Sequence, residues 1–219
     1  IKEEKADFGI ALDGDADRVF FIDEKSETVP ADFITCLIAE DLLKQKKGSI
    51  LYDLRSSWIV KEVVEANGGK ANMCRVGHAF IKEQMRKEKA IFAGELSGHF
   101  YFQDNFYTDS GVIAALKVIQ LISSKGKKLS ELVKPLKKYF ASGEINSEVE
   151  DKEGKMKELA KKFGSGKISW LDGVRIDFED WWFNVRPSNT EPLLRLNLEA
   201  KSQKLMEEKR EEVLDIIMN

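Results

Sequence analysis

Strand-like and helix-like segments alternate through the middle of the chain, and this alternation restricts the possible folds more than any other feature of the sequence. Apolar segments with strand character are each followed by a segment with helical spacing, in the order 50–53, 58–66, 71–75, 79–87, 90–93 and 111–123. This order predicts βαβ units around a mainly parallel sheet, with the apolar last helix buried. The functional loops of such a sheet lie at the carboxyl ends of its strands, where this sequence has Arg55, His78 and Glu95.

The two ends of the chain show different patterns. Residues 6–23 predict a strand, a tight acidic loop and a second strand, and a helix is expected at 31–47. A polar segment at 142–154, interpreted as a linker or an edge segment, leads into a pattern of helix, four strands and helix. These elements are expected at 155–163, 168–170, 173–178, 182–185, 193–199 and 203–217. The second half therefore predicts a small, separate α+β domain.

Composition excludes several classes of protein. The chain has 219 residues, 42% hydrophobic and 33% charged, with a formal net charge of −3, which is typical of a globular protein and argues against a broad nucleic-acid surface. No segment approaches the roughly 18 uninterrupted apolar residues of a membrane span, and no apolar signal core follows the N-terminus. Cys36 and Cys74 lie in apolar contexts and are interpreted as reduced core residues of a cytoplasmic protein.

The loop between the first two expected strands reads Asp13-Gly14-Asp15-Ala16-Asp17-Arg18. Three carboxylates at alternate positions can converge on one hard cation such as Mg²⁺ or Ca²⁺, and their repulsion requires neutralisation by a cation or by Arg18. An EF-hand loop fits only in part, because Arg18 stands where the sharp turn needs glycine and strands replace the flanking helices. A solvated acidic turn is the other alternative.

Two further loops carry residues suited to a phosphosugar. Gly94-Glu95-Leu96-Ser97-Gly98-His99 follows the strand 90–93, and its Glu95 and Ser97 offer acceptors and a donor for sugar hydroxyls. The loop from Arg186 to Pro192 reads Arg-Pro-Ser-Asn-Thr-Glu-Pro and can cradle a phosphate through a guanidinium fork, hydroxyls and backbone N–H groups. Taken singly, the first loop could be a capped turn and the second a rigid hairpin turn.

Taken together, the three loops resemble the α-D-phosphohexomutase family, most closely its phosphomannomutase/phosphoglucomutase branch, over essentially the whole chain from Asp7. Family members have four domains, which carry in turn a catalytic serine in a Ser-His-Asn loop, the metal loop, the sugar loop and the phosphate loop. The resemblance implies a remnant of the second α/β domain at 1–28, a mixed α/β third domain at 29–141 and an α+β fourth domain at 142–219. Because no Ser-His-Asn loop occurs in these residues, the chain is expected to be a C-terminal fragment, inactive without the missing N-terminal domains.

The resemblance also implies a role for each motif residue. Asp13, Asp15 and Asp17 match the Mg²⁺ ligands, Arg18, His78 and His99 match residues of the catalytic centre, and Glu95 and Ser97 match the sugar-binding pair. The implied phosphate-binding residues are Arg186, Ser188, Asn189, Thr190 and Arg55. Arg55 stands where many relatives have lysine, which keeps the charge but changes its geometry.

The activity implied by the resemblance is the interconversion of hexose 6-phosphate and hexose 1-phosphate. It uses Mg²⁺ and a phosphoserine, with hexose 1,6-bisphosphate as intermediate and activator. Phosphoglucosamine mutase is an alternative within the family, but it usually has glutamine where Leu96 stands and glycine where Asn189 stands. A non-catalytic module that binds a phosphosugar or a metal is the alternative from another class.

Overall fold

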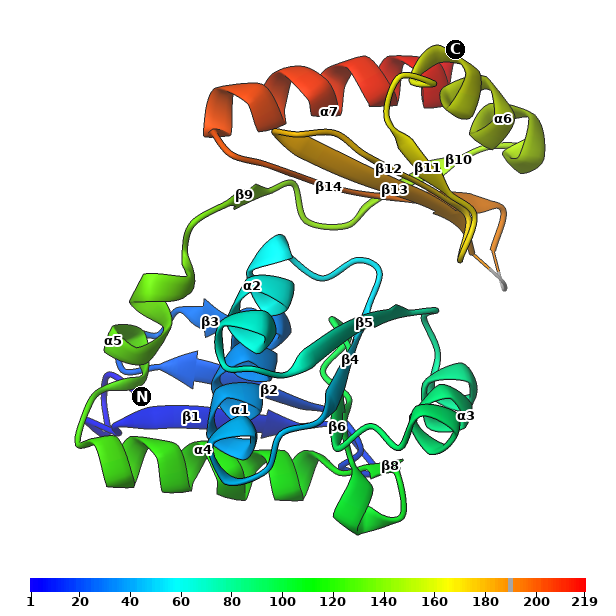
Figure 1. Ribbon diagram of the computed structural model, residues 1–219. Helices are drawn as coiled ribbons and strands as arrows, with labels where there is room; N and C mark the ends of the chain where they lie inside the picture. Colours follow the sequence, from blue (N-terminus) through cyan, green and yellow to red (C-terminus); the bar gives the residue numbers. More distant parts are fainter. Residues whose placement is uncertain (189–190) are drawn as a thin grey trace. The chain divides into compact units, whose positions relative to one another are not determined.

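The computed structural model describes residues 1–188 and 191–219, so the predicted phosphate-binding residues Asn189 and Thr190 lie outside the described residues. The chain divides into two compact units, residues 1–137 and 138–219 (Figure 1). The domain limits expected at 28/29 and 141/142 stay a prediction. In the described ranges, no helix is both long and apolar enough to cross a membrane.

A five-stranded mixed sheet forms the centre of residues 1–137, with the strand order β5-β4-β6-β7-β8. Its strands are β4 (Ser49–Asp53), β5 (Lys70–Cys74), β6 (Phe92–Gly94), β7 (Phe100–Phe102) and β8 (Thr108–Asp109). β4 is parallel to β5 and β6, whereas β7 is antiparallel to β6 and β8 is antiparallel to β7. The prediction of a mainly parallel sheet therefore holds for β5, β4 and β6 but is wrong for the edge formed by β7 and β8, which makes the sheet mixed. β7 and β8 have only three and two residues, too few for strand periodicity to show in the sequence.

Helices cover both faces of this sheet, as expected for βαβ units (Figure 1). α1 (Ala31–Gln45) and α2 (Trp58–Ala66) lie together on one face, and α3 (His78–Glu88) lies on the other. Side chains alternate across the strands, so Leu51 and Ala93 join Met85 of α3 in one hydrophobic cluster. Gly94, the next residue of β6, faces α1 so closely that a Cβ there would clash with Thr35.

α4 (Gly111–Lys125) is expected from the sequence to be buried, but one side of it is exposed. It begins at the N-cap Ser110, whose Oγ accepts a hydrogen bond from the Ile113 N–H at 3.2 Å. Its buried side chains face α1, but Leu116 is 59% exposed on the opposite side of the helix. The prediction of burial is wrong for this face because a mostly apolar helix does not reveal how many neighbours cover it. A short helix, α5 (Leu129–Val133), and single turns η1 (Gln103–Asn105) and η2 (Lys134–Leu136) complete the unit.

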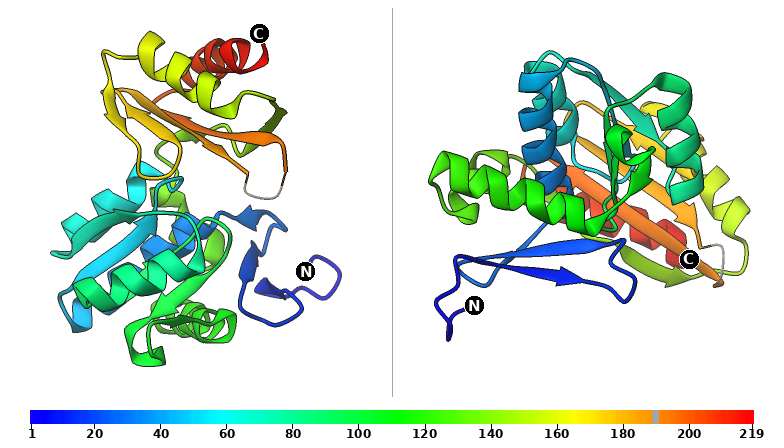
Figure 2. Two further views of the ribbon diagram at one scale, coloured as in Figure 1. Left: turned by 90° about the vertical axis from the view of Figure 1, so that its right-hand side faces the viewer. Right: turned by 90° about the horizontal axis from the view of Figure 1, so that it is seen from below.

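An antiparallel sheet begins the chain and confirms the expected strand, loop and strand. It consists of β1 (Phe8–Leu12), β2 (Val19–Asp23) and β3 (Thr28–Val29) in that order. The right-hand view of Figure 2 shows the blue strands of this sheet side by side. Leu12 pairs with Val19, so the acidic loop 13–18 forms the connection at one end of this ladder.

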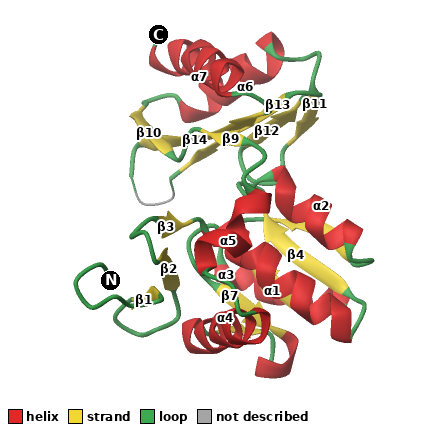
Figure 3. Cartoon of the chain, turned by 90° about the vertical axis from the view of Figure 1, so that its left-hand side faces the viewer, coloured by secondary structure: helices red, strands yellow, loops and turns green. Residues whose placement is uncertain are grey.

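Residues 138–219 form the α+β arrangement expected from the sequence. The sheet is antiparallel, with the order β10-β14-β13-β12-β11, and β9 (Phe140–Ala141) also pairs with β14. Its other strands are β10 (Ile145–Glu148), β11 (Lys167–Ser169), β12 (Val174–Asp177), β13 (Trp181–Pro187) and β14 (Leu193–Ala200). α6 (Lys152–Lys162) and α7 (Gln203–Met218) lie on one face of it (Figures 1 and 3). β10 lies within the polar segment that the sequence predicts as a linker or an edge segment, and it is an edge strand.

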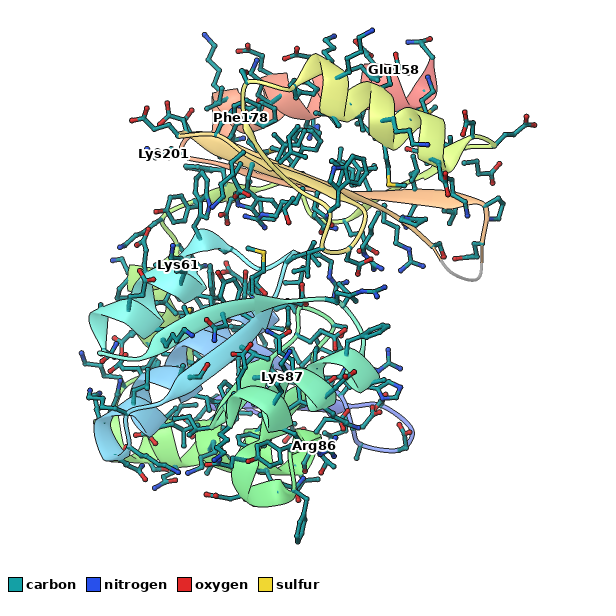
Figure 4. The ribbon with its side chains drawn as sticks, turned by 45° about the vertical axis from the view of Figure 1, so that its right-hand side comes forward. Lys61, Arg86, Lys87, Glu158, Phe178 and Lys201 are labelled. Atoms are coloured by element: carbon teal, nitrogen blue, oxygen red, sulfur yellow. The ribbon has the colours of Figure 1, made fainter. Side chains whose placement is uncertain are left out.

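Aromatic side chains fill the space between this sheet and its helices. Phe163 makes edge contacts with Phe178, Trp181 and Phe183, with ring centroids 6.3, 5.6 and 5.2 Å away. Phe178 also stacks on Trp181 at 4.5 Å, between the sheet and the helices (Figure 4). The resulting core supports the β13–β14 ladder from which the predicted phosphate loop projects.

Candidate functional site

The acidic loop 13–18 brings three carboxylates together. One oxygen each of Asp13, Asp15 and Asp17 lies within 4.8 Å of the other two. The loop turns at Ala16, which has a φ of 60° and whose N–H donates to the Asp13 carbonyl at 3.2 Å. The Ala16 carbonyl accepts a hydrogen bond from the Gly111 N–H at 3.1 Å. This bond fastens the loop to the first residue of α4.

Arg18 neutralises one of these carboxylates. Its Nε lies 2.7 Å from Asp13 Oδ2, and its backbone N–H donates to Asp13 Oδ1 at 3.2 Å. The side-chain hydrogen bond from Arg18 holds the pKa of Asp13 below its ordinary value. Asp17 Oδ1 is shielded from solvent and receives no hydrogen bond from the described residues. Three converging carboxylates, one with an unsatisfied oxygen, fit a hard divalent cation such as Mg²⁺.

Replacing Asp15 with asparagine is expected to weaken Mg²⁺ binding by about tenfold, because the charge on the ligands sets the affinity of an all-oxygen site. Asp15 is exposed, so the fold should not change. Isothermal calorimetry with Mg²⁺, or electron paramagnetic resonance with Mn²⁺, measures the effect. Asp104→Asn, at another exposed aspartate, serves as the control. Equal metal affinity in the two variants would refute the metal assignment.

The loop 94–99 connects β6 to β7 and lies directly against the acidic loop. Its turn is closed by a hydrogen bond from the Gly98 N–H to the Glu95 carbonyl at 3.0 Å, and Gly98 has a φ of 92°, which favours glycine. The Gly98 carbonyl accepts from the Val19 N–H at 3.0 Å, and Arg18 forms an antiparallel bridge with His99. Backbone contacts thus join the predicted metal loop to the predicted sugar loop.

His99 lies where these two loops meet. Its Nδ1 is 3.0 Å from Ser97 Oγ, and its Nε2 is 3.5 Å from Asp17 Oδ2 and 3.9 Å from Asp109 Oδ2. Asp109 in β8 is in turn 2.7 Å from Lys82 Nζ. The contact with Ser97 orients the imidazole so that Nε2 faces the carboxylates. Lys82 and Asp109 belong to this group although no sequence motif indicates them.

Glu95 lies beneath the loop, only 4% exposed. Its carboxylate accepts a hydrogen bond from the Tyr101 hydroxyl at 3.0 Å and lies 3.5 Å from Arg55 Nη2. Burial and the neighbouring Glu95 charge raise the pKa of Tyr101 well above its ordinary value, so the hydroxyl remains a donor. Arg55 is itself buried and contacts Glu95 from the interior. The sugar contact of Glu95 and the anion contact of Arg55 stay predictions.

Asp53 connects Arg55 to the loop 94–99, although no sequence motif indicates this aspartate. At the carboxyl end of β4, its fully buried carboxylate accepts hydrogen bonds from Arg55 N at 2.7 Å, Arg55 Nε at 3.1 Å and Arg55 Nη2 at 3.0 Å. A fourth hydrogen bond, at 2.6 Å, comes from the Leu96 N–H. Burial acts to raise the pKa of Asp53, but the charge and hydrogen bonds of Arg55 and the Leu96 N–H outweigh it and lower the pKa. The sequence signal is an aspartate that ends a buried strand.

His78 lies apart from this group. It is the first residue of α3 and is exposed, after Gly77 with a φ of 116°. The described carboxylates and histidines form two groups that could each hold a metal ion, and His78 is in neither: one is Asp13, Asp15 and Asp17, and the other is Asp17, His99 and Asp109. The predicted catalytic role of His78 therefore stays a prediction.

The predicted phosphate loop starts from β13 in residues 138–219. Arg186 and Ser188 are buried, and the Ser188 N–H donates to the Leu193 carbonyl at 2.8 Å, which closes the loop. Arg195 lies opposite Arg186 in the β13–β14 ladder, and its Nη2 is 3.3 Å from Ser188 Oγ. The loop therefore has a second guanidinium, which becomes visible only once the strand register is known.

Comparison with known proteins assigns these loops to one family. The model described as phosphoglucomutase/phosphomannomutase, alpha/beta/alpha domain III, matches residues 30–139, and the model of the C-terminal domain matches residues 144–216. The phosphomannomutase of Methanocaldococcus jannaschii is 45% identical over 218 residues, which cover 99% of this chain and 49% of that protein. The chain thus spans about half the length of the curated relatives that it matches.

Solved structures agree with this assignment. A phosphoglucomutase/phosphomannomutase family protein from Burkholderia thailandensis has a TM-score of 0.88 and 28% identity, over 98% of this chain and 47% of that chain. An Aspergillus fumigatus N-acetylphosphoglucosamine mutase, solved with GlcNAc-6P and magnesium, shares the fold with a TM-score of 0.71 and 15% identity, over 95% of this chain and 51% of that one. The resemblance inferred from the three loops is confirmed, and the chain belongs to the phosphoglucomutase/phosphomannomutase family.

Proposed function

We propose that this chain is the C-terminal part of a cytoplasmic phosphomannomutase/phosphoglucomutase, which interconverts hexose 6-phosphate and hexose 1-phosphate. The observation that carries the proposal is the contact between the acidic loop and the loop 94–99. The Val19 N–H donates to the Gly98 carbonyl, and His99 Nε2 lies 3.5 Å from Asp17 Oδ2. A metal held by the first loop would therefore lie beside a sugar held by the second, and phosphoryl transfer depends on such alignment.

The acidic loop would supply the metal site of this reaction. Asp13, Asp15 and Asp17 would hold Mg²⁺, which when bound offsets negative charge on a transferring phosphoryl group and acts as a Lewis acid. Arg18 brings a further positive charge to the same loop. Because its side chain lies 2.7 Å from Asp13, it also keeps that carboxylate ionised and ready to bind a cation.

The loop 94–99 would bind the sugar and remove a proton. Glu95 and Ser97 would hold hydroxyl groups of the hexose. We assign Arg55 as a phosphate contact and His78 as a catalytic residue on the family resemblance alone. If His99 Nδ1–H donates to Ser97, Nε2 carries no hydrogen and can accept the proton of the attacking sugar hydroxyl. The sugar oxygen then bonds to phosphorus, the bond between phosphorus and the oxygen of the phosphoserine breaks, and the proton moves to Nε2. The product of this step is the hexose 1,6-bisphosphate.

The loop at the end of β13 would hold the phosphate that is not transferred. Arg186 and Ser188 supply a guanidinium and a hydroxyl, and Arg195 adds a second guanidinium 3.3 Å from Ser188 Oγ. We assign Asn189 and Thr190 to the same cradle on their motif alone. Since the bisphosphate must bind in two orientations, a cradle that recognises only a phosphate can accept either end of the sugar.

Arg186→Ala in the full-length parent protein tests this function. Each hydrogen bond from a charged group contributes about 1.5–3 kcal/mol, so the apparent affinity for a hexose phosphate should fall by about one to two orders of magnitude. Steady-state kinetics with glucose and mannose phosphates measures the effect. Arg210→Ala is the matched control, at an arginine of α7 whose ion pair within the described part of the chain is with its neighbour Glu211 at 3.7 Å.

Two outcomes would count against the proposal. A full-length parent that interconverts neither glucose nor mannose phosphates would exclude a phosphomannomutase/phosphoglucomutase and favour either a phosphoglucosamine mutase or a non-catalytic phosphosugar-binding module. An Arg186→Ala enzyme within about twofold of wild type would exclude the loop as the phosphate site, since a lost charged hydrogen bond costs far more than that.

A further inference from the structure

A glutamate lies between the two arginines of the proposed phosphate cradle. Glu144 follows β9 and immediately precedes β10, and its side chain is 28% exposed. Its Oε2 lies 3.6 Å from Arg186 Nη2, and its Oε1 lies 3.5 Å from Arg195 Nη1. Asn197 Nδ2 donates to Oε2 at 3.4 Å. One carboxylate thus bridges both guanidinium groups.

The strand register explains why these three side chains meet. Arg186 and Arg195 are direct partners across β13 and β14. Ile145 of β10 is the partner of Leu196 on the other side of β14. The partner of Arg195 in β10 is Asn146, so Glu144, two residues before Asn146 and on the same face, approaches the two arginines diagonally from the opposite neighbour of β14.

Two carboxylates offset the charges of the two arginines before any ligand binds, while Lys152, whose Nζ lies 3.4 Å from the Ser188 carbonyl oxygen, adds a further positive charge. Arg186 and Arg195 carry two positive charges, and Glu144 with Glu191, which lies 3.4 Å from Arg195 Nη2, carries two negative charges. Arg195 Nε is shielded from solvent and has no hydrogen-bond acceptor among the described residues. A phosphate monoester with a charge of about −1.5 to −2 would suit the same guanidinium groups. The carboxylate of Glu144 and a phosphate are therefore alternative partners of one arginine pair.

We propose that Glu144 is an internal competitor for the phosphate group and sets how weakly the cradle holds a phosphosugar. This inference rests on the proposed function of the cradle. Glu144 is assigned this role in preference to Glu191 because Glu144 contacts both arginines. Of these two arginines, Glu191 is paired with Arg195, and its side chain is 55% exposed, so water and salt screen its charge. With Glu144 in place, a phosphate must displace a carboxylate or bind against its repulsion.

Phosphate binding to the 219-residue chain tests the inference. Inorganic phosphate and glucose 6-phosphate are titrated into wild type, Glu144→Gln and Glu191→Gln, and binding is followed by NMR shifts of the backbone amides of β13 and β14. Glutamine keeps the size of Glu144 and an acceptor for Asn197 but removes the charge. Loss of one like charge about 5 Å from the ligand should tighten binding roughly tenfold for Glu144→Gln. Glu191→Gln should change it by less than about twofold.

Two further variants make every outcome decisive. Equal or weaker binding by Glu144→Gln, with its amide spectrum intact, would overturn the inference and make Glu144 a support for the arginines. If Glu144→Gln does not fold, Glu144→Ala must bind phosphate more tightly than wild type for the inference to survive. Arg186→Ala distinguishes a failure of the proposed phosphate cradle from a failure of the role proposed for Glu144. If that variant binds phosphate as wild type does, the cradle itself is wrong, whatever Glu144 does.

Discussion

No glucose 6-phosphate is expected when the 219-residue chain alone is incubated with glucose 1-phosphate, glucose 1,6-bisphosphate and Mg²⁺. The proposed reaction passes through a phosphoserine, and these residues contain no Ser-His-Asn loop. Without a nucleophile that carries the phosphoryl group, the two-step transfer has no first step. We expect a rate at least about 10⁴-fold below that of a full-length enzyme, as for other enzymes without their nucleophile. A coupled dehydrogenase assay for glucose 6-phosphate measures it.

Two controls make this negative result informative. A full-length enzyme with established phosphoglucomutase activity shows that the assay detects turnover. A chain with Asp13→Asn and Asp15→Asn, purified in the same way, shows how much activity comes from a contaminating mutase. Turnover by the unaltered chain that disappears in this double variant would contradict the serine-dependent mechanism.

Replacing Asp53 with alanine should lower the free energy of unfolding of residues 1–137 by about 3–5 kcal/mol, because it leaves the buried Arg55 charge without its main partner. Asp53 is fully buried and accepts hydrogen bonds from Arg55 and from the Leu96 N–H. Hydrogen exchange of the β4 and β6 amides during denaturant titration reports this unit separately from residues 138–219. Glu65→Ala removes an exposed pair with Lys61 in the same unit and should cost less than about 1 kcal/mol.

The Asp53 contribution should also depend on pH in a defined direction. Because the folded-state pKa of Asp53 lies below its ordinary value of 3.8, its stabilisation is present above about pH 4 and is lost as the pH falls through the folded pKa. Asp53→Asn cannot ionise, so its unfolding free energy should fall less than that of wild type below pH 4. Parallel pH profiles for wild type and Asp53→Asn, or a loss below 1 kcal/mol in Asp53→Ala, would show that the buried pair does not stabilise this unit.

The elements that the sequence predicts well are those with a local signal. β1, β2, α2 and the strands β11 to β14 appear within one or two residues of their expected limits, because periodicity and turn residues act over a few positions. β7 and β8 are too short to show any periodicity, and the exposed face of α4 depends on which segments cover that helix. These features could not be predicted because they are decided by partners elsewhere in the chain.

The candidate site also has features that the sequence indicates and features that only the tertiary structure reveals. The sequence by itself determined the acidic loop, the loop 94–99 and Arg186 with Ser188, because each motif is contiguous and its chemistry can be recognised from neighbouring residues. Only the tertiary structure decided that the first two loops touch through Val19 and Gly98.

The supporting residues were decided by the tertiary structure alone. Asp53 bonds to the Leu96 N–H across a separation of 43 residues, and Arg195 meets Arg186 only through the register of β13 and β14. Glu144 reaches both arginines from a segment 42 residues before Arg186 in the sequence. The physical reason is common to all three. A motif specifies which groups can bind a ligand, whereas their burial, their charge balance and their neighbours depend on strands that pair across long stretches of sequence.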